Sequence, residues 1–264
     1  KFVSTTNGDI GHWGIAGGPL AQIRTAEVER CAEIFGIETE VLDIHDGELM
    51  PTLENRKIFV RLIREWKADV VMGHRPNDYH PDHRYTGVLM QDAAYMVTVP
   101  NIVAKTPHLE KNPIFVNVED RFSRPTPFDP VIVVDVGSVI EKKVDMYHCH
   151  TSQMYEWLPY NQGILDQVPD GDAARRAWLV SWRSPGWKRT ADRFREKLGL
   201  PFPLVGDPGG TVLKAYRVRW PLIGLAKRVT YVVGRDRRIL KAFRSERSMT
   251  AHAAQACEFV TGLR

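Results

Sequence analysis

The sequence predicts an α/β protein built around a mostly parallel sheet that helices cover. Two observations support this class. Short apolar and β-branched runs alternate with longer segments whose apolar residues recur at helical spacing, and the alternation continues from residue 1 to about residue 105. The chain also has 264 residues, 43% of them hydrophobic, which is enough to bury the core of one large domain or two small ones.

Each expected element has its own justification. Residues 1–6 form a β-branched run that the turn signal "NGDIG" ends, and residues 19–36 have helical spacing with Gly36 placed to end the helix. Further strands are expected where apolar runs recur, at residues 38–44, 68–74, 112–118 and 131–136. Further helices are expected where helical spacing returns, at residues 55–67, 83–98 and 138–154.

Charge is divided unevenly along the chain. Residues 1–171 hold 16 basic and 25 acidic residues, a net charge of −9, whereas residues 172–264 hold 20 and 7, a net charge of +13. Such asymmetry indicates two regions of different character. The basic half has ordinary aromatic and aliphatic content and no repeated Arg/Gly pattern, so nucleic acid is not an expected partner.

Composition also limits the compartment and the redox chemistry. No apolar run approaches the ~18 residues that span a membrane, and no signal peptide opens the chain, so we expect a cytoplasmic protein without membrane contact. Cys31, Cys149 and Cys257 are far apart and form no CxxC pair. We therefore expect inert thiols rather than a disulfide framework or a cysteine-built zinc site.

The segment "NDYHPDHRYTG", residues 77–87, carries the clearest candidate chemistry. It follows the apolar strand expected at 68–74, and ligands gather where parallel strands end. His80 and His83 are three positions apart, so both rings can face one pocket if Pro81 opens a helix. Histidine is the commonest metal ligand, but one histidine pair does not complete a zinc site, and surface histidines at a helix start are the alternative.

The motifs around this segment resemble those of a known family. "TNGDIGHWG", "LDIHDGEL", "RPNDYHPDHRYTG" and "HCHTSQMYEW" occur in the order and at about the spacing seen in the PIG-L or LmbE-like deacetylases. The resemblance covers residues 1–199, including "WKRTADRFREKLG" at its end. It implies a Rossmann-like fold and a zinc-dependent hydrolase that removes acetyl from the amide nitrogen of an N-acetylated sugar or a related small molecule.

The resemblance also implies roles for single residues. His83 would be a zinc ligand, His80 would stabilise the oxyanion of the tetrahedral intermediate, and Asp82 would orient its neighbours. Four further residues match family segments near the substrate and are candidate substrate contacts, with exposed or structural roles as the alternatives: Asp9, His12, Arg24 and His150. Asp43, His45 and Asp46 also lie close together in sequence, and we expect them to be loop groups.

Part of the family's site is missing from this sequence. In the family, an HPDD box after the first strand supplies two more zinc ligands and the general base. No HPDD box occurs in residues 1–264, and the resemblance begins at the strand expected in residues 1–6. We therefore expect the first strand and helix of the family fold to be absent, the zinc site to be incomplete and the activity to be impaired.

The end of the chain resembles a different family. Residues 200–264 are similar to the C-terminal half of a thioredoxin-fold peroxiredoxin of the AhpC/TSA type. A short helix is expected at 211–218, a hairpin at 228–245 and an amphipathic closing helix at 251–263. The reactive cysteine of that family lies upstream of the matching part, and no "TxxC" occurs here, so Cys257 is expected to be an apolar filler.

The sequence therefore predicts two domains, residues 1–199 and 200–264, arising from a natural fusion, an assembly artefact or an engineered chimera. If the parts form one body, the hairpin would pair with the first segment's sheet. Three functions remain open: the deacetylase, a catalytically silent binding or structural module, and a peroxiredoxin-like thiol antioxidant. Unpaired sheet edges would favour a homo-oligomer.

Overall fold

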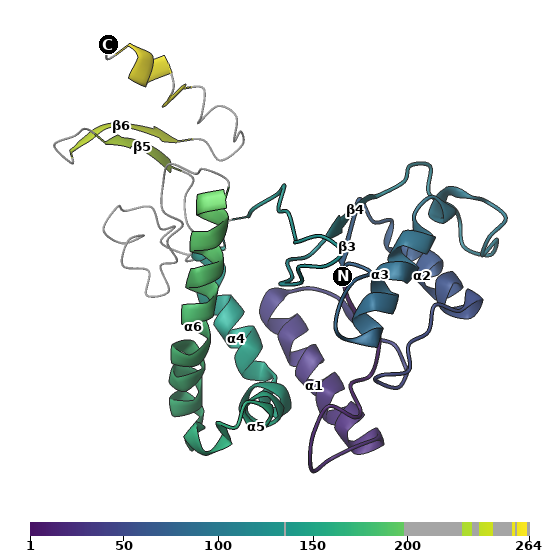
Figure 1. Cartoon of the computed structure of the whole chain (residues 1–264). Helices are drawn as coiled ribbons and strands as arrows, with labels where there is room; N and C mark the ends of the chain where they lie inside the picture. The colour runs from purple at the N-terminus through teal and green to yellow at the C-terminus, as the bar shows by residue number, and fades with distance from the viewer. Residues whose placement is uncertain (135, 198–228, 234–237, 245–254, 257, 263–264) are drawn as a thin grey trace. The chain divides into compact units, whose positions relative to one another are not determined.

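The computed structural model describes residues 1–134, 136–197, 229–233, 238–244, 255–256 and 258–262 (Figure 1). Its contacts divide the chain into two units. The first comprises Lys1–Val133 with Lys142–Trp187, and the second comprises Val134–Glu141 with Lys188–Arg264. Helices and short strands are mixed along the chain, which confirms the α/β class.

The first unit opens with a parallel strand pair joined by a helix. Strand β1 (Phe2–Ser4) pairs in parallel with β2 (Thr39–Val41), and α1 (Gly18–Phe35) connects them. As expected, Gly36 ends the helix: it has φ 63° and ψ 43°, and its N–H donates to carbonyls in the last turn. This left-handed conformation suits glycine, which has no Cβ to clash.

A second parallel pair follows. Helix α2 (Leu53–Trp66) begins where the Thr52 side chain accepts a hydrogen bond from the Asn55 N–H at 3.2 Å. Strand β3 (Val70–Gly73) pairs with β4 (Ile114–Asn117), with α3 (Pro81–Ala93) and the 3₁₀ turn η1 (Met96–Thr98) between them. The described strands of this unit thus form two small parallel sheets of two strands each.

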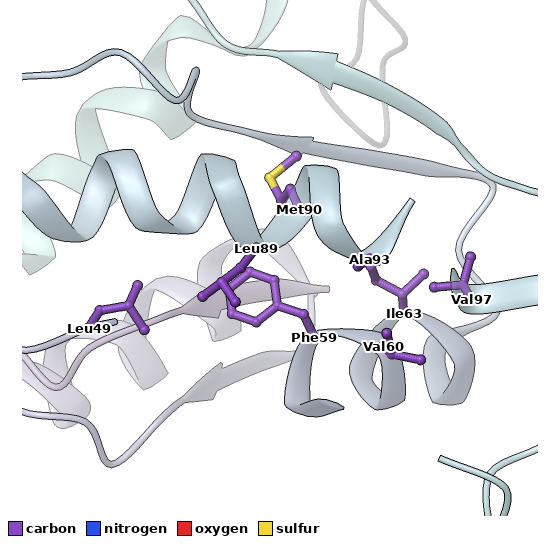
Figure 2. Close-up of a cluster of buried hydrophobic side chains, with 8 residues drawn as sticks. All are labelled: Leu49, Phe59, Val60, Ile63, Leu89, Met90, Ala93 and Val97. Atoms are coloured by element: carbon purple, nitrogen blue, oxygen red, sulfur yellow. The ribbon is translucent and has the colours of Figure 1, made fainter. Parts of the chain in front are cut away.

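The main hydrophobic core lies between α2, α3 and one face of β3 and β4 (Figure 2). Val71 and Phe115 contribute from the strands. The buried side chains of this core are Leu49, Phe59, Val60, Ile63, Leu89, Met90, Ala93 and Val97. The opposite face of the strand pair is open, since Met72 and Ile114 are 69% and 64% exposed. The apolar residues that recur at helical spacing in α2 and α3 therefore cover one face of the strand pair β3 and β4. This packing positions α3, whose start carries the candidate site.

Arg64 is a charged residue inside this core, only 2% exposed. Its guanidinium donates to six backbone carbonyls on the segment that follows α3, those of Met96, Val97, Val99, Ile102, Val103 and Thr106. Burial lowers its pKa below the ordinary value. The Arg64 guanidinium thus holds the segment between α3 and β4 in place through these hydrogen bonds.

Helices follow β4 up to Lys197. Residues 142–187 belong to the first unit, whereas residues 134–141 and 188–197 belong to the second. After the 3₁₀ turn η2 (Gly137–Val139) come α4 (Ile140–Cys149), the π-helical segment η3 (Ser152–Trp157), α5 (Leu158–Asn161), the 3₁₀ turn η4 (Leu165–Gln167) and α6 (Asp172–Lys197). A second core of Met154, Tyr155 and Leu179 packs the helical segments of residues 142–187 together. None of the helices in the described ranges has the length and apolar character needed to cross a membrane.

The second unit contains the predicted hairpin. Strand β5 (Val229–Val233) pairs antiparallel with β6 (Ile239–Arg244), and residues 255–256 and 258–261 are helical where the closing helix is expected. Among the described strands these two pair only with each other, so the pairing expected with the first segment's sheet is not found. The helix expected at 211–218 lies outside the described residues.

One strand prediction is wrong. The apolar run 131–136 forms no strand in its described residues, and Val131 and Val134 are 87% and 73% exposed. β-branched residues favour a strand only where a neighbouring edge supplies hydrogen bonds. No described strand provides that edge to this run.

Candidate functional site

Three loops at the carboxyl ends of parallel strands, together with the start of α3, carry the candidate residues. The loop after β1 holds Asp9, the loop after β2 holds Asp46, and the segment after β3 leads into α3 at Pro81. A hydrogen bond of 2.9 Å between the Thr5 and Thr86 hydroxyls connects the end of β1 with α3. The residues around α3 thus lie where ligands of such folds bind.

His80 caps the first turn of α3. It has an extended backbone conformation, and its Nδ1 accepts a hydrogen bond from the Asp82 N–H at 3.3 Å. Pro81 takes the first helical position, as the sequence predicts. The Asp78 carboxylate accepts from the His80 N–H at 3.0 Å, which fixes the approach to the helix.

Asp82 fastens α3 to the loop after β2. Its two carboxylate oxygens accept hydrogen bonds from the Gly47 N–H at 2.6 Å and the Leu49 N–H at 3.2 Å. The residue is 3% exposed. Asp82 therefore holds the loop that carries Asp46 against the start of α3.

Asp46 is the residue whose role the sequence reasoning missed, because it was expected to be a loop group. The structure brings it to His80 and Asp82, with potential ligand atoms of all three within 4.8 Å of one another. Burial raises the pKa of Asp46, and a hydrogen bond with the Asp82 carboxyl raises it further. Its position after β2 was the signal available in the sequence.

His83 belongs to a second group with His74 and Asp78. Its Nδ1 lies 3.0 Å from one carboxylate oxygen of Asp78, and its ring stacks on His74 with centroids 4.2 Å apart and planes 5° apart. Potential ligand atoms of the three residues lie within 4.8 Å of one another. Burial, and then the neighbouring His83, lower the pKa of His74. The rings of His80 and His83, 4.9 Å apart, join the two groups.

Arg24 and Asp9 lie next to these groups. Arg24 donates to the Gly11 carbonyl at 2.8 Å, and its buried Nε has no hydrogen-bond partner among the described residues. Burial lowers its pKa, while the charges of Glu27 and then Asp46 oppose that effect. Asp9 accepts from the Asp46 N–H at 3.0 Å and is 3% exposed.

His12 and His150 have other partners. His12 accepts at Nδ1 from the N–H groups of Gly14 and Ile15, and its Nε2 lies 3.0 Å from the Glu156 carboxylate. Both nitrogens of His12 are thus occupied. His150 lies 3.2 Å from the Cys31 sulfur and 3.8 Å from the Glu27 carboxylate, which in turn binds Ser152. Neither histidine touches the two groups at α3 in any contact of the described residues.

The loops of the site are joined by an ion pair whose pH dependence can be measured. His45 Nδ1 lies 2.6 Å from the buried Asp9 carboxylate. This bond raises the pKa of His45 and lowers that of Asp9. The contribution of His45 to stability is complete below its unfolded pKa of about 6.5 and is lost as pH rises through the higher folded value, whereas that of Asp9 is lost as pH falls through the lower folded value.

We therefore expect wild-type chain to lose more stability between pH 5.5 and pH 9 than His45→Gln. Urea midpoints of the two proteins at both pH values provide the measurement. Equal losses in both would show that the pair contributes nothing in solution.

Helix α3 packs its backbone directly on the segment that carries His74. A Cβ added at Gly87 would lie 2.7 Å from the His74 carbonyl oxygen and 2.7 Å from the Arg75 carbonyl carbon. We expect Gly87→Ala to lower the free energy of unfolding by about 1–3 kcal/mol, because backbone atoms cannot move aside as a side chain can. Gly18→Ala in α1, where nothing lies within 4 Å, is the control and should leave stability unchanged or slightly raised. Equal effects of the two changes in urea unfolding would contradict the close approach.

Comparison with known proteins yields two separate matches. Residues 1–94 match the PIG-L family, described as GlcNAc-PI de-N-acetylase, and residues 176–242 match the AhpC/TSA family. A diacetylchitobiose deacetylase of Thermococcus kodakarensis is 30% identical over 175 residues, 61% of this chain and 61% of that protein. A candidate peroxiredoxin of Mycobacterium tuberculosis is 35% identical over 79 residues, 29% of this chain and 51% of that protein. The two-part resemblance that the sequence predicts is confirmed, and the chain spans only part of each relative.

Solved structures share the fold. The N,N′-diacetylchitobiose deacetylase of Pyrococcus horikoshii superposes with a TM-score of 0.58 at 23% identity, covering 76% of this chain and 69% of that one. The 4-carboxy-2-hydroxymuconate hydratase of Pseudomonas putida superposes with a TM-score of 0.50 at 18% identity, covering 70% and 87%. Since the two proteins are named for different reactions, the fold does not decide the chemistry, which depends on the residues of the site.

Proposed function

We propose that this chain is a zinc-dependent hydrolase that removes the acetyl group from the amide nitrogen of an N-acetylated sugar. One observation carries the proposal: the Asp46 and Asp82 carboxyls and His80 meet at the start of α3, within the part of the chain that matches the PIG-L family. Similarity to diacetylchitobiose deacetylases supports the deacetylase class.

The side chains present suit a zinc ion. Imidazole nitrogens and carboxylate oxygens are ordinary zinc ligands, and two histidines with one aspartate are gathered at His74, Asp78 and His83. His83 is the ligand that the family resemblance assigns. When bound, zinc would act as a Lewis acid toward the amide carbonyl.

The other residues have separate tasks in this proposal. His80, at the positive end of α3, stabilises the negative charge that develops on the carbonyl oxygen. Asp46, whose pKa is raised by burial, is the proposed general acid that protonates the departing amine. Arg24 contributes its positive charge to the binding of polar groups of the substrate. Asp9, whose carboxylate is held by His45 and the Asp46 N–H, supports the loop after β2. His12 and His150, which the resemblance also assigns to the substrate, act by supporting the helices around the site.

Tyr79 provides a surface for the sugar ring. The residue is 73% exposed and lies edge-on to both His80 and His83, with ring centroids 5.9 and 5.5 Å apart. An exposed aromatic face beside the reacting groups suits the apolar face of a hexose. The small-molecule N-acetylated partner is therefore proposed to be a sugar.

A single assay separates this function from a catalytically silent binding module. The purified chain is loaded with zinc and incubated with N,N′-diacetylchitobiose, and zinc content and released acetate are measured together. Bound zinc with acetate release supports the deacetylase, whereas binding of the sugar without acetate release supports a catalytically silent binding module. Because no HPDD box is present in residues 1–264, the expected rate is below that of relatives that carry one.

A peroxiredoxin-like activity would require a reactive thiolate. Burial raises the pKa of the Cys31 thiol to about 12 and also raises that of Cys149. Thiols of this kind react slowly with peroxide. Cys257 lies outside the described residues, and thiol titration with hydrogen peroxide tests it. Cytoplasmic residence and self-association remain predictions, which cell fractionation and sedimentation can test.

A further inference from the structure

We propose that Phe122 and Tyr79 form one aromatic wall that binds a sugar ring at the start of α3, and that Arg75 holds this wall in position. The inference rests on the proposed function, because its ligand is the N-acetylated sugar of that proposal. It adds a second aromatic contact to the sugar and a positioning residue outside the reacting groups. Neither Phe122 nor Arg75 has a role in the proposed hydrolysis.

The loop that carries Phe122 depends on Arg75 for its position. Residues 118–133 form neither helix nor strand. Arg75 donates from Nε and Nη2 to the two carboxylate oxygens of Asp120, at 2.6 and 2.7 Å, in a forked arrangement that fixes both groups. Its Nη1 donates to the Thr126 carbonyl at 2.9 Å, and its Nη2 donates to the Phe122 carbonyl at 3.4 Å. One guanidinium thus ties three points of the loop to the segment after β3.

Further contacts strengthen this attachment. The Phe122 N–H donates to the Asp120 carboxylate at 3.0 Å, so the group that Arg75 binds also fixes the backbone of the aromatic residue. The Asn77 side chain donates to the Arg124 carbonyl. The Arg75 and Asp120 side chains are only 15% and 11% exposed, and salt screens such a pair less than an exposed one. The loop is therefore held next to the residues that lead into α3.

The attachment places Phe122 beside Tyr79. The two ring centroids lie 6.2 Å apart and the ring planes are tilted by 45°, so the rings form a corner rather than a flat stack. Tyr79 also contacts the rings of His80 and His83, which belong to the candidate site. A pyranose ring carries apolar C–H groups on its faces, and such groups pack well on aromatic rings. The corner therefore offers a sugar ring two aromatic contacts next to the reacting groups.

Binding of N,N′-diacetylchitobiose to the full chain tests the proposal, measured by proton NMR titration with a chelator present to prevent turnover. We expect Phe122→Ala and Arg75→Gln each to weaken binding about threefold to tenfold, the effect of losing one aromatic contact. Phe122→Tyr keeps the ring and should bind like wild type. Two matched controls should also bind like wild type: Trp66→Ala, at an exposed aromatic residue of α2, and Arg56→Gln, at an arginine that pairs with Asp92.

The outcomes separate this inference from the hydrolase. If Phe122→Ala binds the sugar as tightly as wild type, or if folded wild type does not bind it, the aromatic wall is wrong, and acetate release judges the hydrolase separately. Unchanged binding in Arg75→Gln would remove the positioning role of Arg75. Weaker binding in both variants, with no acetate released by zinc-loaded wild type, would support the wall and contradict the hydrolase. Circular dichroism verifies folding, and Asp120→Asn repeats the test of position if Arg75→Gln does not fold.

Discussion

Replacing Arg64 by methionine will lower the free energy of unfolding by about 3–5 kcal/mol, the largest stability loss that we expect from a single change. Methionine fills similar space but donates no hydrogen bond. Six carbonyls on residues 96–106 now accept from the Arg64 guanidinium, and they would be left without this donor in a buried setting. Because the same segment connects α3 with β4, we expect the substitution to destabilise both elements.

Urea unfolding monitored by circular dichroism measures the loss. Arg56→Met is the matched control, since Arg56 lies on the same helix and pairs with Asp92 at 2.6 Å in a partly exposed position. Exposed pairs contribute at most about 1 kcal/mol. A similar loss for both arginines would mean that the carbonyl contacts of Arg64 do not hold the segment in solution.

Replacing His80 by asparagine will lower kcat for acetate release by about a hundredfold to a thousandfold, the largest effect on activity that we expect. Asparagine is a good N-cap, so it can still accept the hydrogen bond that His80 accepts from the Asp82 N–H. The imidazole that stabilises the oxyanion is lost, whereas the start of α3 is retained. The change thus separates chemistry from folding.

The readouts for this variant are kcat, KM and the urea midpoint. We expect kcat to fall while KM and the midpoint stay close to those of wild type, because the substrate contacts lie elsewhere. His108→Ala, at an exposed histidine outside both groups at α3, serves as the control for activity. An unchanged kcat in His80→Asn would remove His80 from the mechanism.

Local patterns in the sequence predicted the local structure well. The Gly36 stop of α1, the Pro81 start of α3 and the hairpin of β5 and β6 each depend on residues within a few positions of one another. The run at 131–136 shows the limit of this reasoning. Its β-branched composition favoured a strand, but a strand also requires a neighbouring strand for its hydrogen bonds. The run itself does not show which distant segment would provide that strand.

For the candidate site too, the sequence predicted the residues that are close together in the chain and missed those that are far apart. His80, Asp82 and His83 lie within one short motif, so sequence alone brought them together. Asp46 is 36 residues away from Asp82, and only the fold shows that their carboxyl groups meet. His12 follows a strand end, as a pocket residue would, but its two nitrogens are bound by groups that the sequence did not reveal.

The boundary between the two parts of the chain stays a prediction. The sequence placed it at residue 199, whereas the AhpC/TSA match begins at residue 176, inside α6. The helix α6 is compatible with both families, because the amphipathic pattern of a helix does not show to which fold it belongs. The uneven charge along the chain therefore indicated two different parts, but it did not show at which residue they join.

Zinc-dependent deacetylation can be measured as acetate release from N,N′-diacetylchitobiose by metal-stripped and by zinc-loaded chain, followed by proton NMR. We expect several acetate molecules per chain with zinc, none without zinc, and release about a hundredfold to a thousandfold slower from zinc-loaded His80→Asn. A folded, zinc-loaded wild-type chain that releases no acetate, or that releases it equally well after chelation, would contradict a zinc-dependent deacetylase at the start of α3.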